Sequence, residues 1–166
     1  MNRFGGIINH LTKKFSGNVS EKGVCKITSS SVFDKYLPKN VVDYDNQNQR
    51  HVFSSLIEQD SWIKFDFVGR VVHPNAYSIR TTIHKRGDVH LKNWVIEGSN
   101  NDKSWKVLDS RKDESSFINP SSENTFNISM LDNEYYRYIR LRQNGPNFKG
   151  TGQLVMSKFE LFGTIK

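Results

Sequence analysis

The sequence contains a single cysteine, Cys25, only four prolines and no long apolar run. One cysteine cannot form a disulfide within the chain, which favours a reducing compartment. A membrane-spanning helix needs about 20 consecutive apolar residues, and no stretch of this sequence provides them. The N-terminal stretch also lacks an apolar core followed by a small-residue cleavage site. We therefore expect no transmembrane segment, no signal peptide and a cytoplasmic, intracellular location.

The sequence also lacks the motifs that usually carry catalysis. It has no glycine-rich phosphate-binding loop, no pair of histidines at metal-binding spacing on a helix and no cysteine pair. No nucleophile with a neighbouring base stands out either. We therefore predict that the protein is not an enzyme and that it needs no cofactor, with a structural calcium ion as the one exception to consider.

Aromatic and basic residues, by contrast, are plentiful. Aromatic side chains make up 12% of the 166 residues, hydrophobic residues 36%, and the formal net charge is +7. This balance is typical of a folded domain with a few large core residues rather than of a disordered chain. The charge is compatible with nucleic acid, anionic lipid or acidic protein as a partner. The basic residues are spread along the chain, so they identify none of these partners.

An aromatic hairpin is predicted between Leu91 and Leu108. Trp94 and Ile96 share one side of its first arm, and residues 98–103 between the arms are the Gly, Ser, Asn, Asp and Lys of a polar turn. We expect Trp94 and Trp105 to lie in the core. Alternating apolar residues predict further strands at 24–28, 61–67, 77–83, 126–130, 137–142 and 154–163, with a turn at 73–75.

A short amphipathic helix is predicted at the N-terminus, because Ile7, Ile8, Leu11 and Phe15 recur at helical spacing. We expect residues 1–20 to form a helix packed on the domain and residues 21–166 to form the domain itself. Many short strands with one helix favour an antiparallel β-sandwich or barrel.

Five segments in this order, SWIKFDF, YSIRT, WVIEGSNNDKSW, RYIRLR and SKFELFG, resemble the discoidin-like domain, also called the coagulation factor V/VIII type C domain. The resemblance to this galactose-binding-domain-like family covers residues 24–165 and is to its intracellular versions from single-celled eukaryotes. It implies an all-β fold, an antiparallel eight-stranded jelly-roll β-sandwich, here with a short N-terminal helix. It also implies a non-enzymatic module that binds through loops at one end.

The resemblance places two polar loops and an early tyrosine near the same end of the sandwich. His, Arg and Asn side chains supply donors for sugar hydroxyls, and Phe and Tyr supply an aromatic face. The candidate ligand-binding residues are Tyr36, His84, Lys85, Arg86, Asn144, Asn147, Phe148 and Lys149.

Three kinds of ligand remain open. The first hypothesis is a binding module that recognises a carbohydrate or a short protein segment. The alternative is an intracellular protein–protein adaptor, in a scaffold or in substrate recognition by a ubiquitin ligase. A polyanion, either nucleic acid or anionic lipid, is the third.

A candidate calcium site combines the loop 43–50 with the last strand. Its residues are Asp43, Asn46, Asn48 and Glu160, and the resemblance implies such a site because some relatives have one. Calcium takes six to eight oxygen ligands, and these four side chains alone do not supply that number.

Overall fold

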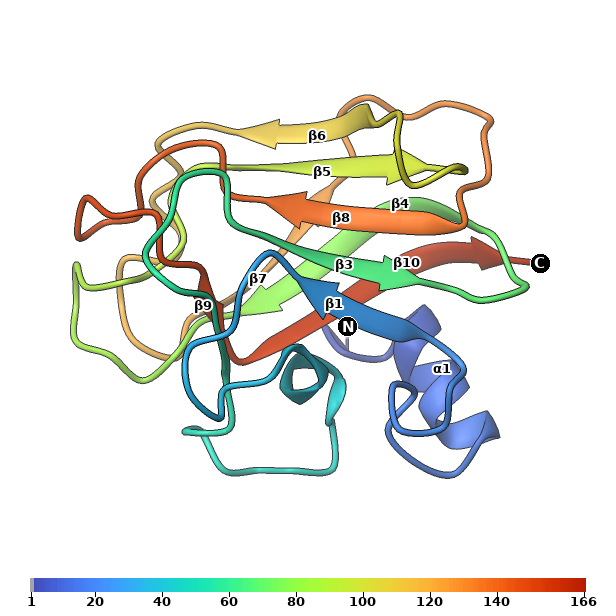
Figure 1. Ribbon diagram of the computed structural model, residues 1–166, viewed down its shortest axis with the longest axis horizontal. Coiled ribbons are helices and arrows are strands. Elements are labelled where there is room, and N and C mark those ends of the chain that lie inside the picture. The colour runs from blue at the N-terminus through green and yellow to red at the C-terminus, as the bar shows by residue number, and fades with distance from the viewer. Residues whose placement is uncertain (1) are drawn as a thin grey trace.

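Alternation of apolar and polar residues gives a fold of short antiparallel strands with one α-helix (Figure 1). The computed structural model describes residues 2–166. The helices are α1 (Ile7–Lys14) and the 3₁₀ helix η1 (Pro38–Val42). The strands are β1 (Lys26–Ser29), β2 (Phe53–Ser54), β3 (Trp62–Asp66), β4 (Val72–Arg80), β5 (Trp94–Ser99), β6 (Lys106–Arg111), β7 (Glu123–Asn127), β8 (Tyr138–Arg142), β9 (Val155–Met156) and β10 (Lys158–Ile165).

Two main sheets form the sandwich. The five-stranded sheet has the order β1-β3-β8-β5-β6, and the three-stranded sheet has the order β10-β4-β7. The short strands β2 and β9 pair with each other at one end. Every strand pair is antiparallel. The two main sheets together supply the eight strands of the predicted jelly-roll sandwich, which is confirmed.

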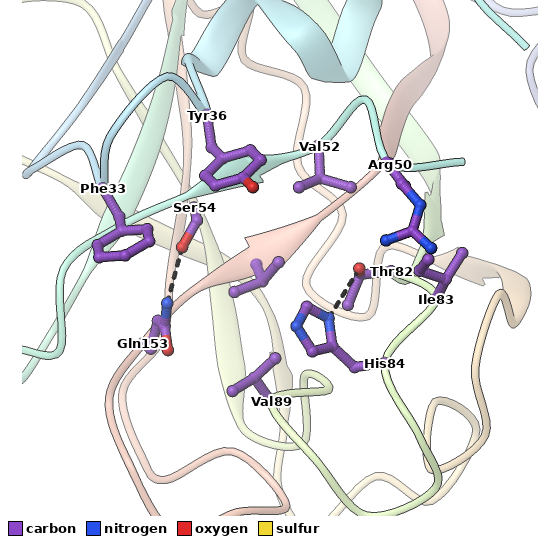
Figure 2. A pocket seen from close by; sticks show the side chains of 11 residues that line it. Phe33, Tyr36, Arg50, Val52, Ser54, Thr82, Ile83, His84, Val89 and Gln153 are labelled. Atoms are coloured by element: carbon purple, nitrogen blue, oxygen red, sulfur yellow. Dashed lines mark hydrogen bonds between the residues drawn. The ribbon is translucent and has the colours of Figure 1, made fainter. Parts of the chain in front are cut away.

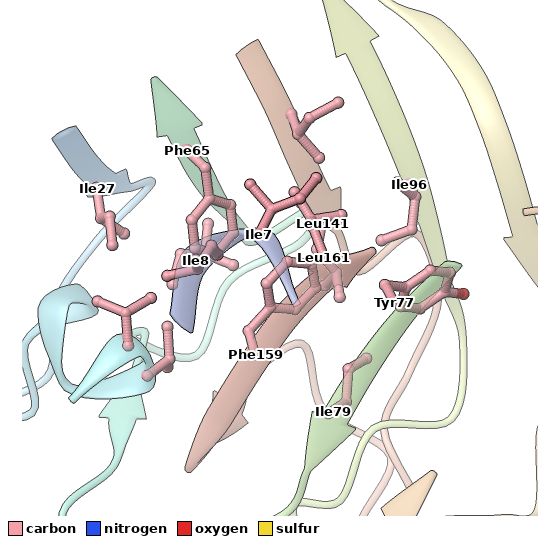
Figure 3. Close-up of a cluster of buried hydrophobic side chains, with 14 of the residues drawn as sticks. Ile7, Ile8, Ile27, Phe65, Tyr77, Ile79, Ile96, Leu141, Phe159 and Leu161 are labelled. Atoms are coloured by element: carbon pink, nitrogen blue, oxygen red, sulfur yellow. The ribbon is translucent and has the colours of Figure 1, made fainter. Parts of the chain in front are cut away.

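The core lies between the two main sheets (Figure 3). Every second residue of β3, β8 and β5 points into it from one sheet, and residues of β4 and β10 point into it from the other. Phe65 of β3 stacks on Phe159 of β10 with 4.6 Å between ring centroids, and Tyr77 of β4 also stacks on Phe159. The buried residues of these strands include Ile63, Phe65, Ile96, Ile139, Leu141, Tyr77, Ile79, Phe159 and Leu161.

The predicted N-terminal helix is confirmed as α1, which packs against β10. Its residues Ile7, Ile8 and Leu11 are buried. Gly6 permits the close approach, since a Cβ at this position would lie 2.2 Å from the carbonyl oxygen of Leu161. The division of the chain at residue 20 stays a prediction. No helix among residues 2–166 is long and apolar enough to cross a membrane.

Two local predictions are wrong. Residues 73–75 are not a turn, because β4 begins at Val72 and runs through them. Pro74 has no N–H to donate, and the ladder accommodates it where the register shifts opposite Phe162 and Gly163. Trp105 is not a core residue: Trp94 is fully buried, whereas Trp105 is only half-buried and lies against Arg140 on the outer face of the five-stranded sheet.

Candidate ligand-binding site at the loop end

Four segments meet at one end of the sandwich, on the left in Figure 1. They are residues 30–37, 50–55, 81–93 and 143–155, and we call this region the loop end. The backbone N–H of Phe33 donates to the carbonyl of Ser54, and that of Phe148 donates to the carbonyl of His90. These bonds tie the loops to one another, so the predicted gathering of the 84–88 and 144–149 loops with Tyr36 at one end is correct.

A pocket of about 370 Å³ opens at the loop end (Figure 2). We call it the aromatic pocket. Val52, Val89 and Val155 are buried and form a small apolar cluster, on which Tyr36 packs. This cluster gives the pocket an apolar inner wall. The lining residues are Phe33, Tyr36, Arg50, Val52, Ser54, Thr82, Ile83, His84, Val89, Gln153 and Val155.

Two aromatic rings stand at the rim of the aromatic pocket. Phe33 and Tyr36 stack in parallel, with 6.1 Å between centroids and 5° between planes. The Phe33 side chain remains 47% exposed. Parallel rings on a pocket rim offer a flat apolar surface to a ligand.

Three polar groups of the aromatic pocket keep unused hydrogen-bonding capacity. His84 Nδ1 lies 2.9 Å from Thr82 Oγ1, and Gln153 Nε2 donates to Ser54 Oγ at 2.9 Å. These bonds orient the two side chains and leave His84 Nε2 and Gln153 Oε1 without partners among residues 2–166. The guanidinium of Arg50 likewise has no partner within the described part of the chain, and Figure 2 shows it directed toward the Thr82–His84 side of the pocket.

A buried histidine holds the loop that carries His84. The Nε2 of His90 bonds the carbonyls of His84 and Lys85 at 2.8 and 2.9 Å, so this nitrogen carries the proton. The ring is fully buried. Two bonds from one rigid ring fix the backbone at His84, and they position its side chain at the pocket.

Of the predicted binding residues, Tyr36 and His84 line the aromatic pocket, and Lys85 and Arg86 do not. Arg86 donates to Asn119 Oδ1 at 3.1 Å. Lys85 is exposed and contributes its carbonyl to the bond with His90. The two residues therefore belong to the same loop but not to the same pocket.

The candidate residues of the second loop, 144–149, also differ in their contacts. Asn147 is buried and organises its own turn, because its side chain bonds the backbone or side chain of Lys149, Thr151 and Gln153. The ring of Phe148 lies under the ammonium of Lys92 at 5.4 Å. Lys149 Nζ lies 3.9 Å from a carboxylate oxygen of Asp88. A ligand-binding role for these residues stays a prediction.

Asn144 lines a separate pocket of about 370 Å³. We call it the amide pocket. Its lining residues are Gln59, Asp60, Gln143, Asn144, Gly145, Pro146, Gly150, Thr151 and Gly152.

Sequence reasoning missed Phe33, Arg50 and Gln153. The spacing of Phe33 and Tyr36, three residues apart in an otherwise polar loop, was a usable signal for the aromatic rim. Arg50 ends the polar loop that was considered only for calcium. Gln153 carries no local signal, because its place at the pocket depends on the distant partner Ser54.

The candidate calcium residues have hydrogen-bond partners within the protein, and calcium binding by them stays a prediction. Both oxygens of Glu160 accept backbone N–H groups, from Gly6, Ile8, Asn9 and Leu161, so this residue caps the start of α1. Asp43 faces His51 Nε2 at 3.0 Å. The side-chain oxygens of the two loop asparagines accept backbone N–H groups within their own loop; these residues are Asn46 and Asn48.

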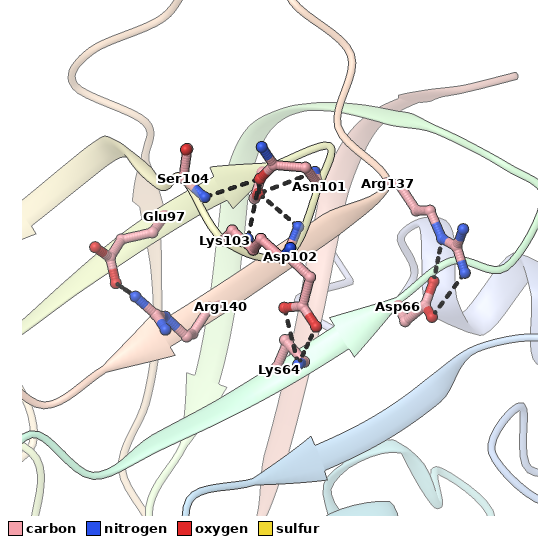
Figure 4. Close-up of polar contacts among 10 residues, drawn as sticks. Lys64, Asp66, Glu97, Asn101, Asp102, Lys103, Ser104, Arg137 and Arg140 are labelled. Carbon is pink, nitrogen blue, oxygen red and sulfur yellow. Dashed lines mark hydrogen bonds and ion pairs between the residues drawn. The ribbon is translucent and has the colours of Figure 1, made fainter.

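The outer face of the five-stranded sheet carries another group of cations and aromatic rings. Figure 4 shows several of the ion pairs on this face. Glu97 is buried between Arg140, at 3.0 Å, and Arg142, at 3.0 Å. Lys64 pairs with Asp102, and Arg137 with Asp66. The bond to Glu97 raises the pKa of Arg142. The face is therefore a surface of mixed and mutually neutralised charge.

Solved carbohydrate-binding modules and lectins have the same jelly-roll fold as this chain. CBM32-3 from a family 31 glycoside hydrolase of Clostridium perfringens superposes with a TM-score of 0.68 at 13% identity, covering 93% of this chain and 98% of that one. CpGH89CBM32-5 from the same organism, in complex with GalNAc-β-1,3-galactose, gives 0.64 at 12% identity, with 86% and 97% covered. A fucolectin from striped bass (Morone saxatilis) serum gives 0.63 at 14% identity, with 85% and 46% covered.

The similar sequences are much longer proteins. The E3 ubiquitin-protein ligase Ufd4 of Drosophila melanogaster is 31% identical over 156 residues, which are 89% of this chain and 6% of the ligase. The E3 ubiquitin-protein ligase hecd-1 of Caenorhabditis elegans is 34% identical over 101 residues, which are 59% of this chain and 4% of that one. The chain thus spans a small fraction of these relatives. No family model matches it.

Proposed function

We propose that this chain is a non-catalytic module that binds a carbohydrate in the aromatic pocket. The supporting observation is the combination of an aromatic rim, an apolar inner wall and three polar groups with unused capacity, Arg50, His84 and Gln153. The C–H face of a sugar ring packs on the aromatic and apolar surfaces. Its hydroxyls accept from Arg50 and donate to Gln153 Oε1, while His84 Nε2 contributes a third directional bond.

The pocket chemistry supports binding rather than hydrolysis. Most enzymes that cleave glycosidic bonds use a pair of carboxylic acids that flank the bond. Among the residues that line the aromatic pocket, none is Asp or Glu. The solved structures with the same fold include carbohydrate-binding modules and lectins, which agrees with a binding role.

The test is titration of the purified protein with galactose, GalNAc and fucose, followed by a glycan array. We expect the variants Arg50→Ala and His84→Ala each to lower affinity for a bound sugar by about tenfold, because each removes a directional hydrogen bond. Arg86→Ala is the matched control: it removes an arginine of the same end that bonds Asn119 outside the pocket, and affinity should stay unchanged. Absence of sugar binding at millimolar concentration, or equal affinity in all three variants, would overturn the proposal.

A short protein segment is the second candidate ligand, and the similarity to ubiquitin ligases favours it. In this case the chain acts as an adaptor domain that recognises a substrate or a scaffold protein. Exposed apolar residues beside the loop end, Leu37, Leu56 and Ile57, suit such a ligand. Ile57→Ser should then weaken capture of the partner while sugar affinity is unchanged. Nucleic acid or anionic lipid as a partner, and a cytoplasmic location, stay predictions from the sequence.

A further inference from the structure

The amide pocket holds a buried acceptor that the protein itself leaves unsatisfied. Ser61 Oγ donates its proton to the carbonyl of Gly152 at 2.7 Å, so it must accept from Gln143 Nε2 at 3.2 Å. This fixes the orientation of the Gln143 amide. Its Oε1 is left without a hydrogen-bond partner, although the residue is only 1% exposed. Native proteins rarely leave such an atom unpaired, so we expect a bound O–H or N–H donor at this oxygen, from a water molecule or from a ligand.

Two further amides border the amide pocket with their side chains unengaged. Gln59 and Asn144 are exposed and make no side-chain hydrogen bond to any residue of 2–166. Asp60 is the one charged residue among those that line the pocket, and its carboxylate is paired with Arg142 Nη1 at 2.8 Å. The pocket therefore presents neutral donors and acceptors.

The lining of the amide pocket is more polar than apolar. The 150–153 segment brings backbone to the pocket surface, and Gly152 has no room for a side chain, since a Cβ there would lie 1.9 Å from the carbonyl oxygen of Glu58. No aromatic ring lines the pocket, and Pro146 is its one cyclic apolar residue. Amide groups and backbone suit the hydroxyl-rich edge of a sugar better than a hydrophobic peptide side chain.

The same segment of chain contributes to both pockets. Gln153 lines the aromatic pocket, and its neighbours Gly150, Thr151 and Gly152 line the amide pocket. A ligand that extends past this segment is therefore the simplest way to engage both pockets.

We propose that the aromatic and amide pockets are two subsites for one extended, neutral glycan of at least two sugar units. The aromatic pocket takes one unit against its rings, and the amide pocket takes the next unit through Gln143, Asn144 and Gln59. This inference rests on the proposed carbohydrate function and adds the size and charge of the ligand to it.

The experiment compares galactose, GalNAc and the disaccharide GalNAc-β-1,3-galactose, together with arrayed di- and trisaccharides, in calorimetric titrations. We expect the wild type to bind a matching disaccharide at least about tenfold more tightly than either of its units, as two or more added hydrogen bonds would give. The double variant with Gln59→Ala and Asn144→Ala should lose this advantage while it keeps monosaccharide affinity. Neither side chain bonds the protein, so the fold should be unaffected. Asn133→Ala, at an exposed site remote from both pockets, is the matched control.

The outcomes separate the two proposals. If monosaccharides bind and longer glycans bind no more tightly, the second subsite is refuted and the carbohydrate function stands. The same holds if the double variant keeps the full advantage of the disaccharide. If no sugar on the array or in solution binds, the carbohydrate function fails, and the extended site fails with it.

Discussion

The outer face of the five-stranded sheet and the loop end use the same residue types in opposite ways. The sheet face gathers Arg140, Arg142 and Lys64 with two tryptophans and Tyr138, yet each of these cations has an acidic partner. At the loop end, Arg50 and Asn144 have no partner within the described residues. The cations of the sheet face are paired within the protein, whereas the loop end keeps some polar side chains available for a ligand.

This difference shows that composition alone does not mark a binding surface. Aromatic and basic residues on one strand face, such as Trp105, Arg140 and Arg142, resemble a site for sugars or polyanions. Glu97 turns them into an internal network instead. What distinguishes a site is polar groups that are held in place but not satisfied, as for His84 and Gln153.

The largest expected effect comes from breaking the network on the sheet face. Glu97→Ala removes the carboxylate shared by Arg140 and Arg142 and leaves two largely buried guanidinium groups without it. Loss of one partner from a buried ion pair costs about 3 to 5 kcal/mol. We expect the free energy of unfolding in urea to fall by about 4 kcal/mol, with no change in sugar affinity.

The matched control is Glu134→Ala. Glu134 is an exposed carboxylate with no ion pair among residues 2–166, so its removal should change stability by less than about 0.5 kcal/mol. A similar small effect for Glu97→Ala would mean that the sheet-face network contributes little, and the contrast between the two regions would lose its energetic basis.

A second internal contact, at Glu160, predicts a dependence of stability on pH. Burial raises the pKa of the Glu160 carboxyl from 4.5 to about 7, although four backbone N–H groups favour its charged form. A pKa that is higher in the folded state means that the protonated form favours folding. This contribution is complete below about pH 4.5 and is lost as the pH rises through about 7.

The variant Glu160→Gln isolates this effect. Between about pH 4 and about pH 8 the wild type should lose about 3 kcal/mol of unfolding free energy relative to the variant, as measured by urea denaturation at each pH. A constant difference across this range would show that the carboxyl keeps its ordinary pKa. A difference that grows in favour of the wild type would show that the four N–H groups outweigh burial.

Most of the fold could be predicted from the sequence because its signals are local. Alternation of apolar residues located β3, β5 and β8, and helical spacing located α1. The turn predicted at 73–75 failed because Pro and Asn are also found at bulges, and only the pairing of β4 with β10 decides between a turn and a bulge.

The site was less predictable, because each loop residue depends on a partner far away in the sequence. Asn147 and Asn144 are three residues apart and equally polar. The side chain of Asn147 makes its hydrogen bonds within its own turn, whereas Asn144 lines a pocket. Glu160 looked like a ligand because it is acidic, and its role as a cap follows only from α1 packing on β10. Residue type suggested the chemistry, whereas tertiary contacts decided which residues remain available for it.

The smallest expected effect sharpens the distinction between a core tryptophan and one on the sheet face. The guanidinium of Arg140 lies 4.0 Å from the ring centroid of Trp105, and such a contact contributes about 0.5 to 1 kcal/mol at a partly exposed site. We expect Trp105→Leu to lower the free energy of unfolding by about 1 kcal/mol and Trp105→Phe, which retains a ring, by about half as much. A buried tryptophan such as Trp94 would cost about 3 to 5 kcal/mol on truncation to alanine. A loss of that size for Trp105→Leu would mean that its ring belongs to the core, and an unchanged stability would mean that the ring only covers the ion pairs beneath it.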